Sequence, residues 1–257
     1  MKAILTVLGS GTSMGVPTIG CTCRVCTSPD PHDRRTRPSV LVEYEGRCVL
    51  IDTTPDFRQQ AIREKIMRLD AILYTHAHAD HILGLDDVRP LSFRSPEKIP
   101  LYAHERAAEA LEQIFRYIFD ANYKYGGIAR VQMNRINGSL ELFGANFEPV
   151  RIVHGEADIH GFRFGSAAYL TDFSEIPDES KEKLRGLDIL FLDALRHRPH
   201  PTHSTVANSL RLVEELKPRR AFFTHISHDL PHDETNQTLP EHVRLAHDGL
   251  KLEFDIA

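Results

Sequence analysis

The sequence predicts a layered α/β fold in which two β-sheets face each other and helices cover both outer sides. Two observations predict it: the chain has two strand-rich halves, and helical segments follow the strands in each half. Such elements bury their apolar faces against each other in layers. With 257 residues, 41% of them hydrophobic, and no low-complexity linker, residues 1–257 are expected to form a single domain.

The strands are predicted by apolar or β-rich runs that glycine or polar residues bound. Two successive runs joined at Glu45 and Gly46 predict a hairpin. In chain order the predicted strands are AILTVLGSG, SVLVEYEG, RCVLIDTTP, LDAILYTH, IPLYAH, NFEPVRIVH, FRFGSAAYLTD, LDILFLDA and RRAFFTH.

The helices are predicted by amphipathic spacing and by their start and stop signals. Asp56 is the expected cap of the first helix, and Pro90 is expected to end the second. In chain order the predicted helices are DFRQQAIREK, a short one in HADHILGLDDVRPL, ERAAEALEQIFRYIFD, one near 174–185 and one at 204–217.

The segment 117–135 is rich in aromatic and basic residues, and its part 121–135 is predicted to be irregular. Its tyrosines, Tyr117, Tyr123 and Tyr125, have three alternative roles. They cover a cleft, contact a second copy in a homodimer, or pack in the core.

Composition excludes several partner classes. The net charge is −5 and no Lys/Arg run exceeds a pair, so a long nucleic acid is not expected to bind, whereas a small anionic substrate is compatible. No apolar run approaches the ~18 residues of a membrane span. Four cysteines without a secretory signal favour a reducing compartment, so a cytoplasmic location is expected.

The strongest chemical signal is THAHADH at residues 75–81, which follows a predicted strand. It presents four side chains that bind metals through imidazole or carboxylate groups. They are His76, His78, Asp80 and His81.

Three further strands also end in a ligand-type residue. His154 follows PVRIV, Asp172 follows AAYLT, and His225 follows RRAFFT. Sites in layered α/β folds gather at one end of the strands, so these residues are expected to meet the first four. Seven such side chains suit two metal ions better than one.

Taken together, these motifs resemble those of the metallo-β-lactamase superfamily. The resemblance implies a four-layer αββα sandwich of two mixed sheets flanked by helices, with a dinuclear site in the cleft. It assigns His76, His78 and His154 to one metal and Asp80, His81 and His225 to the other, with Asp172 bridging them. It also makes Asp52, in VLIDTTP, a residue that orients a ligand histidine.

Within that superfamily the chain resembles the PhnP-type phosphodiesterases, which hydrolyse cyclic ribose phosphates. The resemblance rests on GSGTSMGVPTIGCTCRVC near the N-terminus, on THISH at 224–228 and on HST at 203–205. It implies a structural zinc site of Cys21, Cys23, Cys26 and His228, since thiolates in a closed site favour zinc. Three reduced loop cysteines, or a redox pair with a spare, are the alternatives.

The expected reaction is hydrolysis of a small, cyclic or linear, nucleotide or ribose phosphodiester. A metal-bridging hydroxide attacks phosphorus, with Mn²⁺, Zn²⁺ or Fe²⁺ as the catalytic metals. The catalytic residues are expected to be His203, Asp80 and Asp52, with His203 as general acid and His200 as its rival. Ser204 or Thr205 is expected to cap the following helix, whose N-terminus favours a phosphate.

Two other functions share parts of this pattern. A tRNase Z-like ribonuclease has the same HST and metal motifs, but it normally carries a long basic arm that is not visible here. A PqqB-like protein of cofactor biosynthesis shares the CxCxxC motif, and would bind a ligand without hydrolysing it. The complete ligand series argues against the second.

Overall fold

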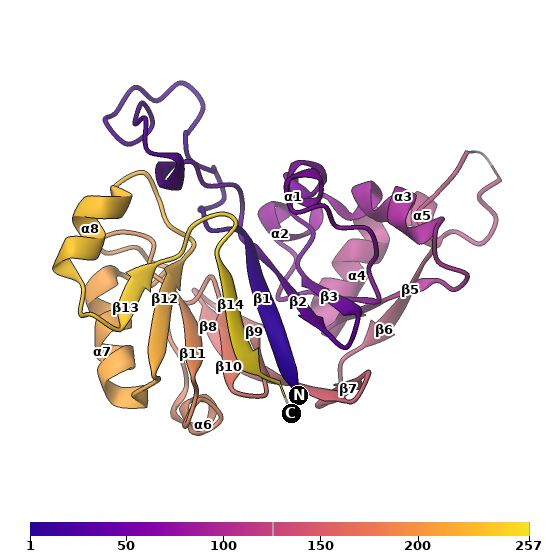
Figure 1. The fold of residues 1–257 in the computed structure, drawn as a ribbon. Coiled ribbons are helices and arrows are strands. Elements are labelled where there is room, and N and C mark those ends of the chain that lie inside the picture. The colour runs from indigo at the N-terminus through magenta and orange to yellow at the C-terminus, as the bar shows by residue number, and fades with distance from the viewer. Residues whose placement is uncertain (125, 257) are drawn as a thin grey trace.

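The expected four layers are confirmed in a computed structural model, which describes residues 1–124 and 126–256. Two seven-stranded sheets face each other, and helices lie on both outer sides (Figure 1). Tyr125 lies outside the described residues. No described helix is long and apolar enough to cross a membrane.

Each sheet is mixed, with one antiparallel and one parallel half. The first contains β1 (Lys2–Gly9), β2 (Ser39–Tyr44), β3 (Arg47–Ile51), β4 (Ala71–Leu73), β5 (Ile99–Ala103), β6 (Val131–Arg135) and β14 (Lys251–Asp255). Their order is β14-β1-β2-β3-β4-β5-β6, and pairing changes from antiparallel to parallel at β3.

The second sheet repeats this arrangement. It contains β7 (Leu140–Leu142), β8 (Ala145–His154), β9 (Ala157–Phe164), β10 (Ala167–Leu170), β11 (Ile189–Asp193), β12 (Arg220–Thr224) and β13 (Val243–Leu245). Their order is β13-β12-β11-β10-β9-β8-β7, and pairing becomes parallel after β10. Parallel strands end at the same edge of a sheet, so the residues after β10, β11 and β12 lie together.

Helices cover the outer faces. Over the first sheet lie α1 (Phe57–Arg63), α2 (Ala79–Ile82), the 3-10 helix η2 (Leu85–Val88), α3 (Arg89–Ser92), α4 (Glu105–Ile114) and α5 (Arg116–Phe119). Over the second lie α6 (Asp178–Glu182) and α7 (Val206–Leu216), with α8 (His232–Thr238) beside β13.

Side-chain alternation along the strands builds three apolar layers. In β2, Val40 and Val42 point between the sheets, where they join Phe147 and Phe191, whereas Leu41 points to the helices. The outer layer of the second sheet includes Val213 from α7. At roughly 25 cal/mol per Å² of buried apolar surface, these layers supply the main stabilisation of the fold.

Three expected elements differ in detail. The helix expected over ERAAEALEQIFRYIFD is divided at Phe115, whose φ of −102° and ψ of 37° are not helical. Pro90 does not end a helix; it lies in the first turn of α3, where its missing N–H costs nothing. The run expected as one strand at 162–172 contains the end of β9, a turn at Gly165, and β10.

Asp56 precedes α1 but makes no side-chain cap hydrogen bond. Its carboxylate accepts from the backbone N of Arg37 at 2.9 Å and from Arg37 Nη1 at 3.0 Å. The ion pair with Arg37 has replaced the expected cap.

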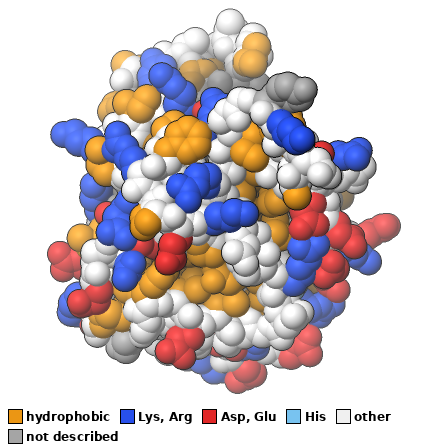
Figure 2. Space-filling view, turned by 90° about the vertical axis from the view of Figure 1, so that its right-hand side faces the viewer, with side chains coloured by type: hydrophobic (Ala, Val, Ile, Leu, Met, Phe, Trp, Pro, Cys, Tyr) orange, Lys and Arg blue, Asp and Glu red, His pale blue; other side chains and the backbone are white. Residues whose placement is uncertain are grey.

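The segment 117–135 is more regular than expected, since its end forms the edge strand β6. Tyr117 packs against the outer core and donates to Asp86 Oδ1 at 2.8 Å, which fits core packing. Figure 2 shows this side of the molecule, where Lys and Arg side chains lie beside exposed hydrophobic ones. Phe93 is 53% exposed and Tyr123 is 40% exposed.

Candidate dinuclear metal site

Three candidate metal ligands and the orienting residue Asp52 stand at the carboxyl ends of strands. Asp52 follows β3, His154 ends β8, Asp172 lies two residues after β10, and His225 follows β12. Three of them have left-handed backbone, with φ of 66° at Asp52, 59° at Asp172 and 57° at His225. Such conformations cost on the order of 1 kcal/mol or more in non-glycine residues, and they persist at functional sites because the surroundings enforce them.

The structure brings all seven predicted ligand residues together as two groups that share Asp172. One group is His76, His78, His154 and Asp172, and the other is Asp80, His81, Asp172 and His225. Within each group, one ligand atom of every residue lies within 4.8 Å of the others. The residues divide into the same two sets that the resemblance implies, and Asp172 is common to both.

Distances in the second group show how closely its side chains converge. The Nε2 atom of His225 lies 3.1 Å from Asp172 Oδ2, and the Nε2 atom of His81 lies 3.3 Å from Asp172 Oδ1. Asp80 Oδ2 is 3.3 Å from His81 Nε2 and 3.6 Å from His225 Nε2. In the first group, His76 Nε2 is 3.9 Å from Asp172 Oδ2.

Several of these atoms are buried with no hydrogen-bond partner among the described residues. They are Nε2 of His76, His81 and His225, and Oδ2 of Asp80. Each such buried polar atom costs about 1–3 kcal/mol unless something satisfies it. Metal ions would satisfy all of them, and imidazole with carboxylate is a suitable ligand set. The clusters therefore fit a dinuclear metal site.

Neighbouring charges shift the pKa values of residues in the second ligand group. Burial alone would lower the pKa of His81, but the charges of Asp172, Asp80 and Asp52 raise that pKa well above its usual value. Burial opposes ionisation of Asp172, yet His225 and His81 hold its pKa well below the usual range. Carboxylates that stay ionised in a buried site provide the negative charge that divalent ions require.

Residues just outside the two groups orient the ligands. Asp52 accepts from the backbone N of Thr75 at 2.9 Å, from Thr75 Oγ1 at 2.8 Å and from His81 Nδ1 at 2.8 Å. Nδ1 of His154 donates to the carbonyl oxygen of Thr202 at 2.8 Å. Both contacts fix a ring and leave its Nε2 for the cluster, as is usual for metal-bound histidine.

His203 has a partner that the sequence analysis missed. Its Nδ1 lies 2.7 Å from Oδ2 of the fully buried Asp193, at the end of β11, and its ring stacks on His225 with centroids 4.6 Å apart. Burial raises the pKa of Asp193, whereas burial and the charge of His225 lower the pKa of His203 to about 4. Asp193 could have been predicted in the same way as Asp172, because it too follows an apolar strand, LDILFL.

The rival histidine is held differently. His200 Nδ1 accepts from the backbone N of Thr202 at 3.3 Å, and its ring lies 4.9 Å from that of His203.

Of the two expected caps, Thr205 is the N-cap of α7, since its hydroxyl accepts from the Asn208 N–H at 3.2 Å. Ser204 pairs with Ser209 instead.

Gly9, the last residue of β1, allows another part of the chain to pack closely against it. A Cβ at Gly9 would lie 1.9 Å from the carbonyl oxygen of Arg37, so no larger residue fits there. The loop that follows Gly9 runs beside His225, with the Ile226 N–H donating to Ser10 O at 2.9 Å.

A hollow of about 200 Å³ lies beside the first ligand group. His76, His78 and His154 form one wall, and His104, Arg106 and His160 contribute to the remainder. The rings of His104 and His160 are stacked with centroids 3.2 Å apart. No described residue of 117–135 lines this hollow, so a cleft cover, one of the three alternative roles of the tyrosines, is not observed there.

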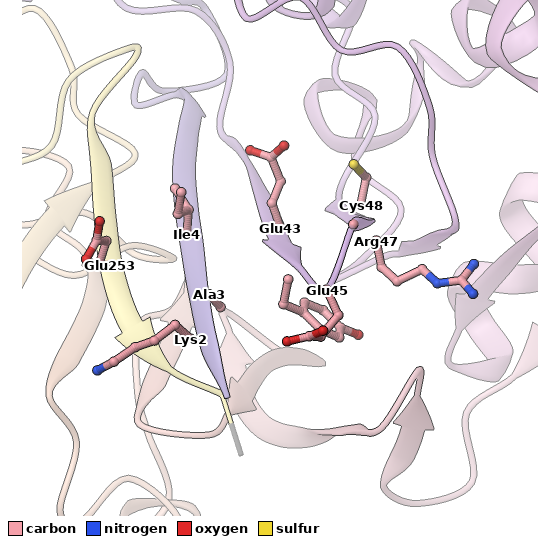
Figure 3. Close-up of a pocket in the computed structure, with 10 residues that line it drawn as sticks. Lys2, Ala3, Ile4, Glu43, Glu45, Arg47, Cys48 and Glu253 are labelled. Atoms are coloured by element: carbon pink, nitrogen blue, oxygen red, sulfur yellow. The ribbon is translucent and has the colours of Figure 1, made fainter.

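A larger hollow, of about 510 Å³, lies elsewhere (Figure 3). It is lined by β1, β2, β3 and β14 and by the hairpin turn at Glu45. That turn is at the opposite end of β3 from Asp52, and no histidine lines the hollow. We therefore do not regard it as the active site.

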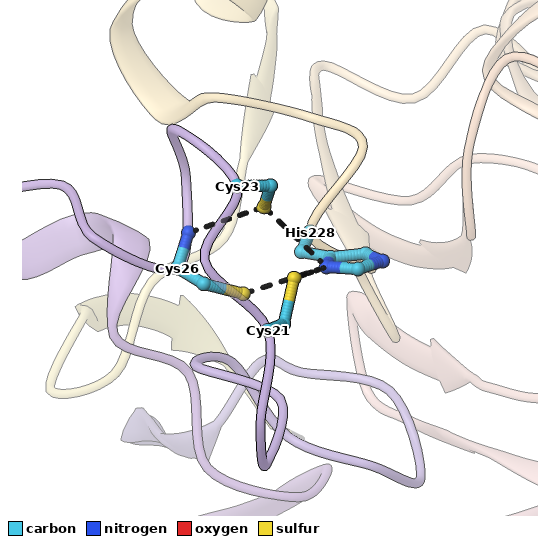
Figure 4. Close-up of side chains that lie close together, drawn as sticks. All are labelled: Cys21, Cys23, Cys26 and His228. Carbon is cyan, nitrogen blue, oxygen red and sulfur yellow. Dashed lines mark hydrogen bonds between the residues drawn. The ribbon is translucent and has the colours of Figure 1, made fainter.

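The three N-terminal cysteines meet His228 (Figure 4). Its Nδ1 lies 3.2 Å from Cys21 Sγ, 3.5 Å from Cys23 Sγ and 3.4 Å from Cys26 Sγ. All four cysteines of the chain are free thiols. Three sulfurs and one imidazole nitrogen around a common centre fit a structural zinc ion, and His228 lies three residues after His225.

Comparisons with known proteins agree with this geometry. The β-lactamase superfamily domain matches residues 47–226. The chain is similar to a solved diphosphatase from the PhnP family, with 64% identity, a TM-score of 0.95, and coverage of 100% of this chain and 98% of that one.

Two curated relatives are more distant in length or sequence. An octanoyltransferase of Porphyromonas gingivalis is 38% identical over 99% of this chain, but this chain spans only 52% of that protein. A coenzyme PQQ synthesis protein B of Xanthomonas campestris is 25% identical, over 96% of this chain and 99% of that protein. Because the superfamily domain matches more than half of the sequence, and the 64% identity extends over nearly the whole of both chains, this chain belongs to the metallo-β-lactamase superfamily and, within it, to the PhnP family.

Proposed function

We propose that this chain is a dinuclear metal-dependent phosphohydrolase that cleaves a P–O bond of a small diphosphate or phosphodiester. The observation that carries the proposal is the pair of ligand groups that share Asp172, with their unpartnered atoms directed at each other. Mn²⁺, Zn²⁺ and Fe²⁺ are the candidate metals, because this mixture of imidazole and carboxylate accepts each of them. When bound, two such ions supply a hydroxide nucleophile at neutral pH and neutralise charge on the phosphate oxygens.

The chain's own residues then hold the reacting groups in place. Asp52 and the carbonyl of Thr202 fix the rings of His81 and His154, so that their Nε2 atoms keep one direction during the reaction. His78 is the exposed member of the first group, so the substrate phosphate is expected to enter from its side.

His203 is proposed to protonate the leaving oxygen. Its pKa of about 4 makes the imidazole neutral at pH 7 in the free protein, so the proton is taken up when the anionic substrate binds, because the substrate's negative charge favours the imidazolium. The Nδ1 contact with Asp193 leaves its Nε2 for the substrate, and the stacking on His225 holds it against the second ligand group. A general acid so placed typically contributes 10²–10⁴-fold. The contact with Asp193 supports His203 over His200, whose Nδ1 is bonded within its own loop.

The hollow beside the first group is proposed to receive the part of the substrate that does not react. Its volume of about 200 Å³ is below the 300–1,000 Å³ of typical ligand pockets, so it suits one phosphate or one ribose. Arg106 supplies a positive charge at its rim, and the imidazoles of His104 and His160 supply hydrogen-bonding groups.

Two substrate classes are compatible with this site. A diphosphate linkage is suggested by the name of the 64% identical relative. A ribose phosphodiester is suggested by the motif resemblance and by the His203–Asp193 contact. An alkoxide leaving group needs a proton, whereas a leaving phosphate, with a pKa near 6, needs little assistance.

The test is an assay of metal-free protein reloaded with Mn²⁺, Zn²⁺ or Fe²⁺. Its substrates are bis(p-nitrophenyl) phosphate, a cyclic ribose phosphate, a set of small diphosphates and a precursor tRNA. We expect turnover that Asp172→Asn abolishes and that Asp56→Asn, a carboxylate paired with Arg37 away from the ligand groups, retains. No turnover with any of these metals would favour a PqqB-like binding protein instead. Cleavage of precursor tRNA alone would favour the ribonuclease.

A further inference from the structure

A second cluster of histidines lies beyond the structural cysteine site, and the proposed reaction does not use it. His32 belongs to the 3-10 helix η1 (Pro31–Asp33), His232 begins α8, and His247 follows β13. The ring centroids are 4.6 Å apart for His32 and His232, and 4.4 Å apart for His32 and His247.

Buried polar contacts hold two of these histidines in one rigid unit. The fully buried Arg35 donates to Asp33 Oδ1 at 3.0 Å and to the carbonyl oxygens of Ser227 at 2.9 Å and Leu230 at 2.7 Å. The same Asp33 Oδ1 accepts from the backbone N of His232 at 2.9 Å. These hydrogen bonds connect the segment that carries His32 to the start of α8, where His232 lies. The fold therefore holds the two imidazoles next to each other.

The donor set is that of a metal site. One ligand atom each of His32, His232 and Asp233 lies within 4.8 Å of the other two. Two ligand bonds of about 2.1 Å span about 4 Å, so small side-chain rotations bring all three to one ion. Asp30 Oδ1 lies 3.3 Å from His32 Nδ1, which is how carboxylates commonly orient metal-bound histidine.

An unsatisfied buried atom points independently to a ligand. His232 is only 6% exposed, yet its Nδ1 has no hydrogen-bond partner among the described residues.

We propose that His32, His232 and Asp233 hold a further divalent transition-metal ion, distinct from the dinuclear site and from the cysteine site. Two imidazoles and one carboxylate suit Zn²⁺, and the neighbouring His247 or water would complete the coordination. Such an ion would fasten the loop after CxCxxC to α8. It would thus reinforce, from a second point, the segment that carries His228.

The test counts zinc in matched variants, because the other sites also bind it. Protein saturated with Zn²⁺ and then dialysed is measured by elemental analysis, and the last equivalent is titrated by calorimetry. We expect His32→Ala and Asp233→Asn each to contain about one equivalent less than the parent chain, or to bind that equivalent at least about tenfold more weakly. The control is His242→Ala, an exposed histidine outside the cluster, which should match the parent.

Two further readouts separate this site from the others. Asp233 is exposed, so Asp233→Asn should keep the fold, and its turnover should stay within about twofold of the parent chain. With Co²⁺ in place of zinc, the thiolate charge-transfer band of the cysteine site should be unchanged in this variant. Equal zinc content and equal titration curves in the parent chain, His32→Ala and Asp233→Asn would overturn the proposal.

Discussion

Nδ1 of His203 lies 2.7 Å from Oδ2 of Asp193, and this contact joins the loop before α7 to the buried end of β11. The contact holds Nδ1 and leaves Nε2 free, in a ring whose centroid lies 4.9 Å from that of His154 and 4.6 Å from that of His225. The HST motif indicated His203, but only the fold supplies the residue that positions it.

Asp193→Asn should slow the cleavage of substrates with poor leaving groups. The amide has nearly the same shape, but its oxygen or its NH₂ group faces Nδ1 without the negative charge. We expect kcat for an alkyl phosphodiester to fall by about 10²-fold or more, and kcat for a p-nitrophenyl ester to change little. Equal losses on both substrates, with metal content unchanged, would show that Asp193 does not assist proton donation.

His203→Ala and His200→Ala form a matched pair in one loop. If His203 donates the proton, His203→Ala should lose most turnover of an alkyl diester while retaining both metals, and His200→Ala should lose about tenfold at most. The measurement is kcat across a leaving-group series. The reverse ranking of the two variants would transfer the role to His200.

Asp52→Asn should weaken metal binding rather than abolish it. Asp52 does not belong to either ligand group, but it holds His81 through Nδ1 at 2.8 Å. Removing such a partner typically costs 10–100-fold in metal affinity. Competition of Mn²⁺ with a chromogenic chelator measures this loss, and Asp56→Asn serves as the control. An unchanged affinity would mean that Thr75 alone positions the ring.

Cys23→Ala should remove the structural zinc and lower the melting temperature. A structural zinc site contributes about 10 kcal/mol or more of apparent binding free energy, which is lost with a ligand. Cys48, the one cysteine outside the cluster, supplies the control Cys48→Ala. A full complement of tightly bound zinc in Cys23→Ala would contradict the site.

His160→Ala and Arg106→Ala should raise KM several-fold with little change in kcat. Both residues line the hollow next to the first ligand group, so they are expected to bind ground state and transition state alike. Glu45→Gln, in the larger hollow of Figure 3, should leave both constants unchanged. An effect of Glu45→Gln equal to that of Arg106→Ala would place the substrate elsewhere.

Local patterns in the sequence predicted most of the strands, because alternating apolar residues are visible within a few positions. Segment ends and breaks were harder to predict. The division of the long helix at Phe115 and the turn at Gly165 depend on packing against neighbouring layers, which a single stretch of sequence does not contain. The missing cap at Asp56 also depends on tertiary packing, since its carboxylate pairs with Arg37, which is 19 positions away in the sequence.

The sequence by itself determined the chemistry: HAHADH places four metal-binding side chains within six residues, and CTCRVC places three thiols within another six. Which side chains meet was decided by the tertiary structure. Asp172 is common to both ligand groups, Asp193 contacts His203, and His32 contacts His232, which is 200 positions away in the sequence. These contacts form because strands far apart in the chain end at the same edges of the two sheets, where their loops pack together. Ligand spacing within one turn or loop is a local property, whereas contacts between loops exist only once the layers have packed.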